Sequence, residues 1–238
     1  MIEAFSSIEA KNIMPNFCVF ASEEFSRLEP NIEERISVIW DAEKEKRKDA
    51  IFDGKILSLR ELNSNYLLGE FIPYRSFLAQ SIDPYLAKKI NVFPVGVSGI
   101  MVGDRHVLVG KRSSLVTSYP GHYEFVPSGS ISYESSEAGF INYRMQILKE
   151  LYEETGILPT YVTSLQPFAL LIDRDRSLVD ICLFFYFGEN FPTRTNNEYL
   201  SLFWLPFDEV EEFLMKNSDK FVPTSFSIFS LIRERKWI

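Results

Sequence analysis

The stretch KELYEETGI, residues 149–157, decides which fold the chain adopts. Glu150, Glu153 and Glu154 are spaced i, i+3 and i+4, so a helix places all three carboxylates on one face, where each like-charged pair costs roughly 0.2–0.5 kcal/mol. Gly156 is a typical residue for the left-handed position just past a helix, so the carboxylates also lie near the negative end of the helix dipole. This unfavourable placement of charge requires an explanation.

The chain as a whole has the composition of a globular protein. Its 238 residues are 46% hydrophobic and 24% charged, enough to bury one large domain or one domain plus a smaller unit. No segment approaches the roughly 20 apolar residues of a membrane span, and the first residues lack a basic start, so we expect neither a membrane partner nor a signal peptide. Cys18 and Cys182 form no CxxC pattern, which favours a reducing, cytoplasmic setting.

The net charge of −8 argues against nucleic acid as a partner, because duplex binding needs a concentrated basic surface. It does not exclude a phosphate-bearing small molecule if a divalent cation stands between the two anions. His106 and His122 fit neither an HExxH nor a paired-cysteine spacing, so we expect no zinc site.

The hydrophobic pattern changes near residue 91 from helix-rich to strand-rich, which predicts an N-terminal extension over 1–91 and a second domain over 92–238. The extension is predicted to contain a helix over 30–50, a hairpin at Asp53-Gly54, a strand at YLLGEFI and a helix over about 74–89. The second domain is predicted to contain strands over 93–102, 106–111, 122–127, 165–172, 178–188 and 199–205, a helix over about 137–155 and two C-terminal helices. We therefore expect an α/β protein of the α+β kind, in which helices sandwich a mixed sheet.

The acidic helix and the segment before it suggest what balances the charge. An apolar stripe, which we expect to pack on the sheet, is formed by Ile141, Met145, Leu148 and Tyr152, with Leu151 beside it. The preceding segment YEFVPSGSIS ends a short strand and opens a Ser-Gly turn, whose carbonyls can reach the acidic end of the helix. Because Mg²⁺ prefers carboxylate and other oxygen ligands, a bound dication turns three repelling charges into a binding site.

Gly129, followed by residues 149–157, resembles the Nudix box, GX5EX7REUXEEXGU, in which U is a bulky aliphatic residue. The second half matches at every fixed position except Lys149, where arginine is usual. The first half departs, because Gly129 and Lys149 are 20 positions apart instead of 14, so the loop carries about six extra residues. Glu134 and Glu137 are both candidates for the first glutamate of the box.

The resemblance implies a Nudix fold and a hydrolase that cuts the diphosphate bridge of a nucleoside diphosphate derivative with Mg²⁺ or Mn²⁺ and water. Carried over residue by residue, it makes Glu150, Glu153 and Glu154 metal ligands, assisted by a carbonyl near Gly129. Glu153 and Glu154 thereby belong to the catalytic apparatus. Glu198 lies before a strand, where Nudix proteins commonly place an additional glutamate, although a solvated loop acid is the alternative interpretation.

Four basic residues are candidates for substrate contacts, and each is alternatively a surface charge: Lys111, Arg112, Arg174 and Arg176. The order of segments over roughly 50–188 is similar to that of Nudix proteins that hydrolyse UDP-glucose and UDP-galactose to UMP and sugar 1-phosphate. The extension then walls the substrate cleft, or alternatively serves packing or dimerisation.

Two alternatives to a nucleotide-sugar hydrolase stay open. The first is a hydrolase of ADP-ribose or a related dinucleotide. The second is a silent Nudix protein that binds a nucleotide, because an ammonium at Lys149 cannot reproduce the planar donor fork with which the family's arginine braces a metal-binding glutamate. The sequence does not determine the oligomeric state.

Overall fold

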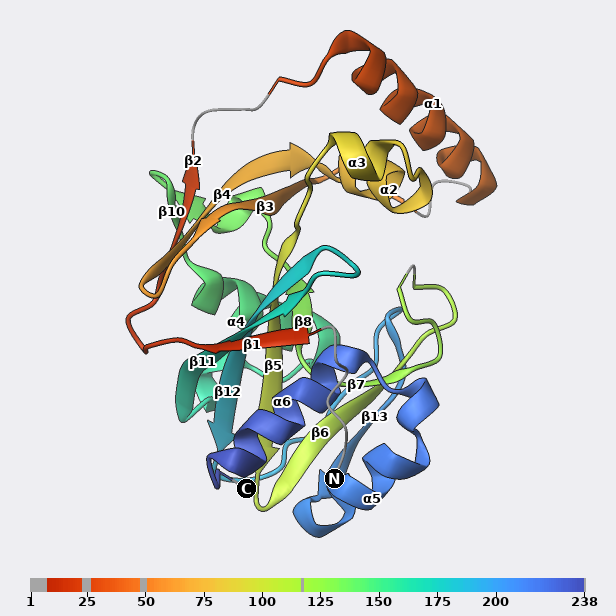
Figure 1. Cartoon of the computed structure of the whole chain (residues 1–238). Helices are drawn as coiled ribbons and strands as arrows, with labels where there is room; N and C mark the ends of the chain where they lie inside the picture. Colours follow the sequence, from red (N-terminus) through yellow and green to blue (C-terminus); the bar gives the residue numbers. More distant parts are fainter. Residues whose placement is uncertain (1–7, 23–26, 48–50, 117, 238) are drawn as a thin grey trace.

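The computed structural model describes residues 8–22, 27–47, 51–116 and 118–237, which form two β-sheets flanked by helices (Figure 1). In spatial order, the larger sheet contains β1 (Ile8–Asn12), β11 (Ser164–Asp173), β12 (Leu178–Phe187), β5 (Val95–Gly103), β6 (His106–Arg112) and β13 (Tyr199–Pro206). Two short strands join it, β7 (Tyr123–Phe125) on β6 and β8 (Ser128–Ser130) on β5. The pairing of β12 with β5 is parallel and the other pairings are antiparallel, so the sheet is mixed.

The smaller sheet, in the upper half of Figure 1, contains β3 (Lys55–Leu62), β4 (Tyr66–Pro73), β2 (Cys18–Ser22), β10 (Phe140–Ile141) and β9 (Ser136–Glu137). The α-helices are α1 (Pro30–Arg47), α2 (Tyr74–Ile82), α3 (Leu86–Lys89), α4 (Tyr143–Thr155), α5 (Phe207–Lys216) and α6 (Pro223–Glu234). Three 3-10 turns complete the regular structure: η1 (Tyr133–Ser135), η2 (Pro159–Tyr161) and η3 (Ser218–Lys220).

Strand pairing crosses the predicted boundary near residue 91 in both directions. β1, from the first part of the chain, is the edge strand of the larger sheet and runs antiparallel to β11. β10, from the second part, pairs with β2 in the smaller sheet through Phe140 and Phe20. The extra loop residues noted in the sequence therefore form a hairpin that ties the two sheets together.

One hydrophobic core lies between the two sheets and includes helix α4. The smaller sheet and its connections contribute Phe17, Val19, Leu57, Leu67 and Phe71, the larger sheet contributes Val95, Val97, Leu108, Ile181 and Phe185, and α4 contributes Tyr143, Ile147 and Leu151. The opposite face of the larger sheet is covered by α5 and α6, where Phe125, Phe221 and Phe229 pack together. Helices α1 to α3 enclose a third, smaller cluster around Ile36 and Leu86. The two predicted parts of the chain thus share their largest core.

The face of α4 that is buried differs from the predicted one. Met145 and Tyr152 are exposed, so this part of the predicted stripe is wrong, whereas Ile141 is buried and Leu148 packs against the core as predicted. The helix turns Tyr143, Ile147 and Leu151, spaced i, i+4 and i+8, toward the core. Both sets have helical spacing, so the sequence offers two apolar stripes and the position of the sheets selects one. The predicted start near residue 137 is also wrong, because residues 136–141 form the β9–β10 hairpin and the side chain of Asn142 caps the helix by accepting the N–H of Met145 at 3.1 Å.

Two predictions in the first part of the chain are corrected as well. Asp53 and Gly54 precede β3, and Asp53 accepts the backbone N–H of Arg75 at 2.9 Å at the start of α2. The hairpin turn lies at 63–65, where the side chain of Asn63 accepts two backbone N–H groups. The helix predicted over 74–89 is divided into α2 and α3 at Asp83, because the residue before a proline disfavours helical geometry. Among the described residues, no helix is both long and apolar enough to cross a membrane.

A single substitution in the shared core tests whether the two sheets fold as one unit. Phe17 is 2% exposed, so Phe17→Ala should lower the free energy of unfolding by about 3–5 kcal/mol, through lost burial and the cavity left behind. Urea unfolding followed by circular dichroism and by tryptophan fluorescence should give coincident curves that shift together. Phe52→Ala, at a position that is 85% exposed, is the matched control and should change stability by less than about 0.5 kcal/mol. Separate transitions for the two probes would contradict shared folding.

Candidate functional site

The loop between β12 and β13 closes the acidic end of α4. Gly156 ends the helix with φ 74°, and the helix carbonyls of Thr155 and Glu153 then accept the backbone N–H of Arg194 at 2.9 Å and the side-chain amide of Asn196 at 3.2 Å. These donors satisfy carbonyl groups that a helix end otherwise leaves to water. They also bring Glu198, two residues after Asn196, beside the helical glutamates.

Glu154 is the most enclosed of the acids, with only 1% of its surface exposed. Its Oε2 accepts the backbone N–H of Ser128 at 3.1 Å, and its Oε1 lies 3.3 Å from the hydroxyl of Tyr199. Burial, and then the nearby charges of Glu124, Glu150 and Glu198, raise the pKa of Glu154 well above its usual value. The Ser-Gly turn therefore supplies an N–H donor to the helix, and not only carbonyls.

Glu150 faces the same turn at the position of Gly129. A Cβ atom at Gly129 would lie 2.4 Å from the carboxyl carbon of Glu150, so only glycine leaves room for this side chain. The Oε1 of Glu150 accepts the side-chain amide of Gln146 at 2.6 Å. Burial raises the pKa of Glu150 to about 7, opposed by the Gln146 bond and reinforced by Glu153 and Glu198.

Glu124 is a further acid of this site that the sequence analysis did not single out. It is buried on β7, pairs with the guanidinium of Arg112 and accepts the hydroxyl of Tyr199 at 2.6 Å. The ring of Tyr199 crosses Gly110, where a Cβ would lie 2.5 Å from it. The sequence of β7, Tyr123-Glu124-Phe125, contained a signal for this residue. Side chains alternate along a strand, so Glu124 points to the face opposite to the two aromatic rings.

Glu124, Glu150 and Glu198 line a cleft of about 490 Å³, together with Gly129, Arg112 and Arg176. Glu154 and Tyr199 lie behind this lining and do not belong to it. Burial, together with Glu124 and Glu153, raises the pKa of Glu198, which Arg112 opposes. Glu153 itself is exposed at the edge of the site. Within the described part of the chain, no three His, Cys, Asp or Glu side chains meet closely enough to hold a metal ion as they stand.

The four predicted basic residues divide into two pairs. Arg112 and Arg176 line the cleft, and Arg112 is further held by donating its Nε–H to the carbonyl of Ser118 at 3.0 Å. Lys111 points to the other face of the sheet, with its Nζ 5.5 Å from the ring centroid of Tyr123. Arg174 pairs with Glu9 of β1 at 2.9 Å. The structure does not bring Lys111 and Arg174 into the cleft.

Lys149, which stands where the Nudix box has arginine, pairs with Glu134 at 2.9 Å. Glu137, the other candidate for the first glutamate of the box, lies on β9. Both partners are largely exposed, and such pairs contribute at most about 1 kcal/mol. The lysine thus forms an ion pair with the lengthened loop, and it also lines the cleft beside the half-buried Glu150, whose pKa its charge lowers.

Comparison with known proteins identifies the fold. The chain is similar to a bifunctional NMN adenylyltransferase/ADP ribose pyrophosphatase from Francisella tularensis, complexed with AMP and a Mn ion, at 14% identity and a TM-score of 0.50, over 68% of this chain and 47% of that one. It is also similar to the NUDIX domain of Shewanella oneidensis NrtR complexed with ADP ribose (18% identity, TM-score 0.49, 64% and 96% covered). A Nudix hydrolase from M. smegmatis, RenU, is a third similar structure (15%, 0.43, 60% and 83%).

No protein-family model matches the sequence, and no curated protein does. The chain spans about half the length of the Francisella tularensis enzyme. The likeness to the Francisella tularensis structure extends to the fold, and it confirms the prediction of a mixed α+β Nudix fold. In this chain the fold has two sheets, with the acidic helix in the core between them.

Gly129 provides a direct test of the packing that positions Glu150. Gly129→Ala should lower the free energy of unfolding by about 1–3 kcal/mol, because the added methyl overlaps the Glu150 carboxyl group. Gly188→Ala is the matched control, since a Cβ there meets nothing within 4 Å, and it should leave stability unchanged. Urea unfolding of the three proteins measures the effect. Equal stability of the two variants would show that the Glu150 side chain moves aside freely.

Asp180 gives a pH-dependent test at the floor of the cleft. Burial raises its pKa from 3.8 to about 6, so the folded protein keeps a proton that the unfolded chain releases, and stability falls as pH rises through this window. Asp180→Asn should match the wild type below pH 4 and exceed it above pH 6 by up to about 3 kcal/mol, at roughly 1.4 kcal/mol per pKa unit. Urea unfolding across pH 4–8 measures this, with the exposed Asp219→Asn as control. Parallel curves for Asp180→Asn and the wild type would exclude the raised pKa.

Proposed function

We propose that the protein is a divalent-metal-dependent hydrolase that cleaves the diphosphate bridge of a nucleoside diphosphate linked to a second moiety. The observation that carries this proposal is the group of five glutamates, Glu124, Glu150, Glu153, Glu154 and Glu198, whose charges influence one another beside a Ser-Gly turn. An acidic group of this kind next to Arg112 and Arg176 suits a ligand that is itself anionic and arrives with a cation.

In donor type the residues present suit Mg²⁺ or Mn²⁺, and binding would require the described carboxylates to move closer together than they now lie. Glycine at 129 leaves the space that the Glu150 carboxylate occupies, and the available donors are carboxylate and carbonyl oxygens, which hard cations prefer. The pKa values of Glu150 and Glu154 are raised chiefly by burial and further by the neighbouring glutamates, and a bound cation would oppose both effects. Glu150, Glu153 and Glu154 would hold the cation, assisted by a carbonyl near Gly129. Such a cation neutralises phosphate oxygens and lowers the pKa of water.

The chain's own groups supply the remaining functions. Arg112 is fixed by Glu124 and by the carbonyl of Ser118, so its guanidinium is oriented before a phosphate arrives. Arg176, from the β11–β12 hairpin, lines the same cleft as Arg112. Glu198 is the candidate for the base that accepts a proton from water, because burial and neighbouring glutamates raise its pKa toward the range in which a base works.

Two substrate classes fit this proposal. The order of segments in the N-terminal part favours a nucleoside diphosphate sugar such as UDP-glucose, cleaved to nucleoside monophosphate and sugar 1-phosphate. ADP-ribose or a related dinucleotide fits equally, and the Francisella tularensis protein of similar fold is described as an ADP ribose pyrophosphatase. We also propose a cytoplasmic setting, in keeping with the free thiols of Cys18 and Cys182.

A silent nucleotide-binding protein is the second candidate function. The observation that favours it is the contact of Lys149 with Glu134 of the loop, which leaves Glu150 without the bidentate brace that an arginine provides. Binding of a nucleotide derivative without any turnover is the behaviour expected in that case.

Incubation of the full chain with Mg²⁺ and a panel of UDP-sugars, ADP-ribose and dinucleotides tests the proposal, with products identified by mass spectrometry. We expect release of nucleoside monophosphate, loss of that release with EDTA, and at least a hundredfold lower turnover for Glu150→Gln and Glu154→Gln. Their thermal midpoints in EDTA should equal or exceed that of the wild type, because an amide cannot ionise and so avoids the cost of enclosing a carboxylate that raises both pKa values. Glu212→Gln on the exposed side of α5 is the matched control. Absence of product from every panel member would exclude the hydrolase, and calorimetry would then test for silent binding.

A further inference from the structure

The cleft continues past Arg176 into a second chamber of about 690 Å³. Ser118, Tyr119, Arg176 and Leu178 line both spaces, so the two are continuous. The far wall of the chamber is helix α2, from the N-terminal part of the chain. Figure 1 shows the β6–β7 loop and the β11–β12 hairpin rising from the larger sheet toward this helix. The volume lies within the range of roughly 300–1,000 Å³ typical of small-molecule sites.

Tyr119 lies at the junction of the two spaces, and we call its ring, held by Arg176 and His122, the platform. Asp173, 3% exposed, accepts the backbone N–H of Arg176 at 3.1 Å and its Nη1–H at 2.9 Å. The guanidinium carbon thereby lies 5.4 Å from the ring centroid of Tyr119, and His122 packs edge-on against the same ring at 5.4 Å. Because these contacts set the orientation of the Tyr119 ring in advance, this side chain loses little further conformational entropy when a flat ligand stacks on it.

Two residues at the mouth of the chamber adopt left-handed backbone conformations that side chains rarely take. Tyr119 has φ 49° and Ser177 has φ 53°. Both line the chamber, and they come from separate loops of the larger sheet. Backbone strain of this kind persists where the surrounding structure enforces it, and it clusters at ligand sites.

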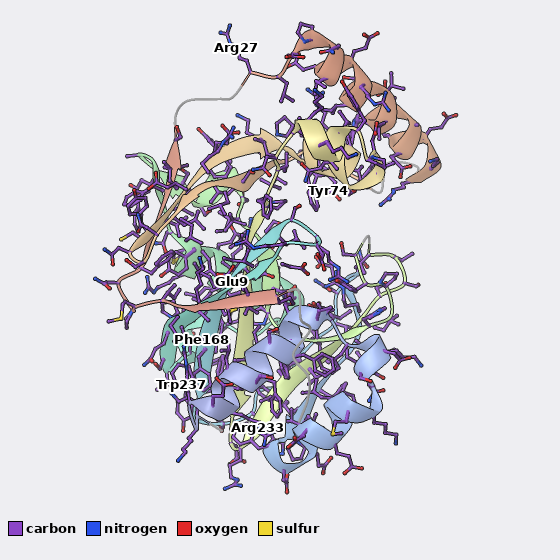
Figure 2. The ribbon with its side chains drawn as sticks, viewed as in Figure 1. Glu9, Arg27, Tyr74, Phe168, Arg233 and Trp237 are labelled. Atoms are coloured by element: carbon purple, nitrogen blue, oxygen red, sulfur yellow. The ribbon has the colours of Figure 1, made fainter. Side chains whose placement is uncertain are left out.

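The wall formed by α2 is aromatic. Tyr74, labelled on α2 in Figure 2, and Phe77 lie with their ring centroids 6.2 Å apart, and both line the chamber. Gln80 is also on this wall, and its side-chain amide forms two hydrogen bonds with the backbone of Val92. It donates to the Val92 carbonyl at 2.8 Å and accepts the Val92 N–H at 2.8 Å. The first cleft, in contrast, is rich in carboxylates. A flat aromatic group therefore suits the chamber, and phosphate with its cation suits the cleft.

We propose that the second chamber binds the nucleoside half of the substrate, with the base between Tyr119 and the aromatic wall of α2. The ribose then lies near the hydroxyls of Ser118 and Ser177, and Arg176 meets the phosphate that joins the two spaces. This assignment rests on the proposed function and gives the N-terminal part of the chain a direct role in substrate selection.

Photoaffinity labelling locates the base directly. The full chain with Mg²⁺ is irradiated immediately after mixing with 5-azido-UDP-glucose or 8-azido-ADP-ribose, and the modified peptides are identified by mass spectrometry. We expect labels within residues 74–87 or at 118–119, which unmodified UDP-glucose or ADP-ribose should suppress. Labels confined to other segments would overturn the assignment. The proposed function stands or falls separately, on release of nucleoside monophosphate by the unlabelled wild type.

Substitution of the platform gives an independent measure. Tyr119→Ala should raise KM for the substrate that the wild type cleaves by about 5- to 100-fold, the range expected for loss of base stacking, and Tyr119→Phe should restore it to within about twofold. Tyr186→Ala, 46% exposed at the other end of β12, is the matched control and should leave KM unchanged. An unchanged KM in Tyr119→Ala would overturn the assignment. Should that variant fail to fold, as judged by its thermal midpoint, the labelling of the wild type decides.

Discussion

The burial of one carboxylate, that of Glu154, constrains the rest of the site. A charged group removed from water costs several kcal/mol unless partners compensate it, and the partners here are the N–H of Ser128 and the hydroxyl of Tyr199. The first requires that the Ser-Gly turn pass directly over α4. The second requires that the Tyr199 ring cross the sheet above Gly110. Helix, turn and strand β13 are therefore fixed relative to one another by a single acid.

A phenol has one hydrogen, which links this acid to its neighbour. The hydroxyl of Tyr199 lies 2.6 Å from Glu124 and 3.3 Å from Glu154, so both contacts are hydrogen bonds at once only if one of the two acids carries a proton. The raised pKa of Glu154 agrees with that arrangement. The resulting chain from Arg112 through Glu124 and Tyr199 to Glu154 joins the basic side of the cleft to its acidic side, and hydrogen-bonded networks of this kind hold their members in one geometry.

The second structural theme is the mutual dependence of the two sheets. The lengthened loop of the box, which departs from the family pattern, forms the β9–β10 hairpin and pairs with β2. The start of the chain contributes β1 to the larger sheet in return. α4 packs in the core shared by both sheets, and α2 directly follows β4, whose Phe71 belongs to that core. A ligand that spans both spaces would then contact the acids of the cleft and the side chains of α2 at the same time.

The sequence by itself determined the mixed α+β Nudix fold, the acidic end of α4 and most strand positions, because these follow from local spacing and from a motif nine residues long. Only the tertiary structure decided which apolar stripe of α4 is buried, since the stripes through Ile147 and Met145 are both helical and differ only in what packs on them. The tertiary structure also decided that Arg112 and Arg176 line the cleft whereas Lys111 and Arg174 do not. It placed Glu124, which the sequence analysis had not singled out, in the same cleft. These outcomes depend on contacts between residues far apart in the chain, whose direction local patterns do not encode.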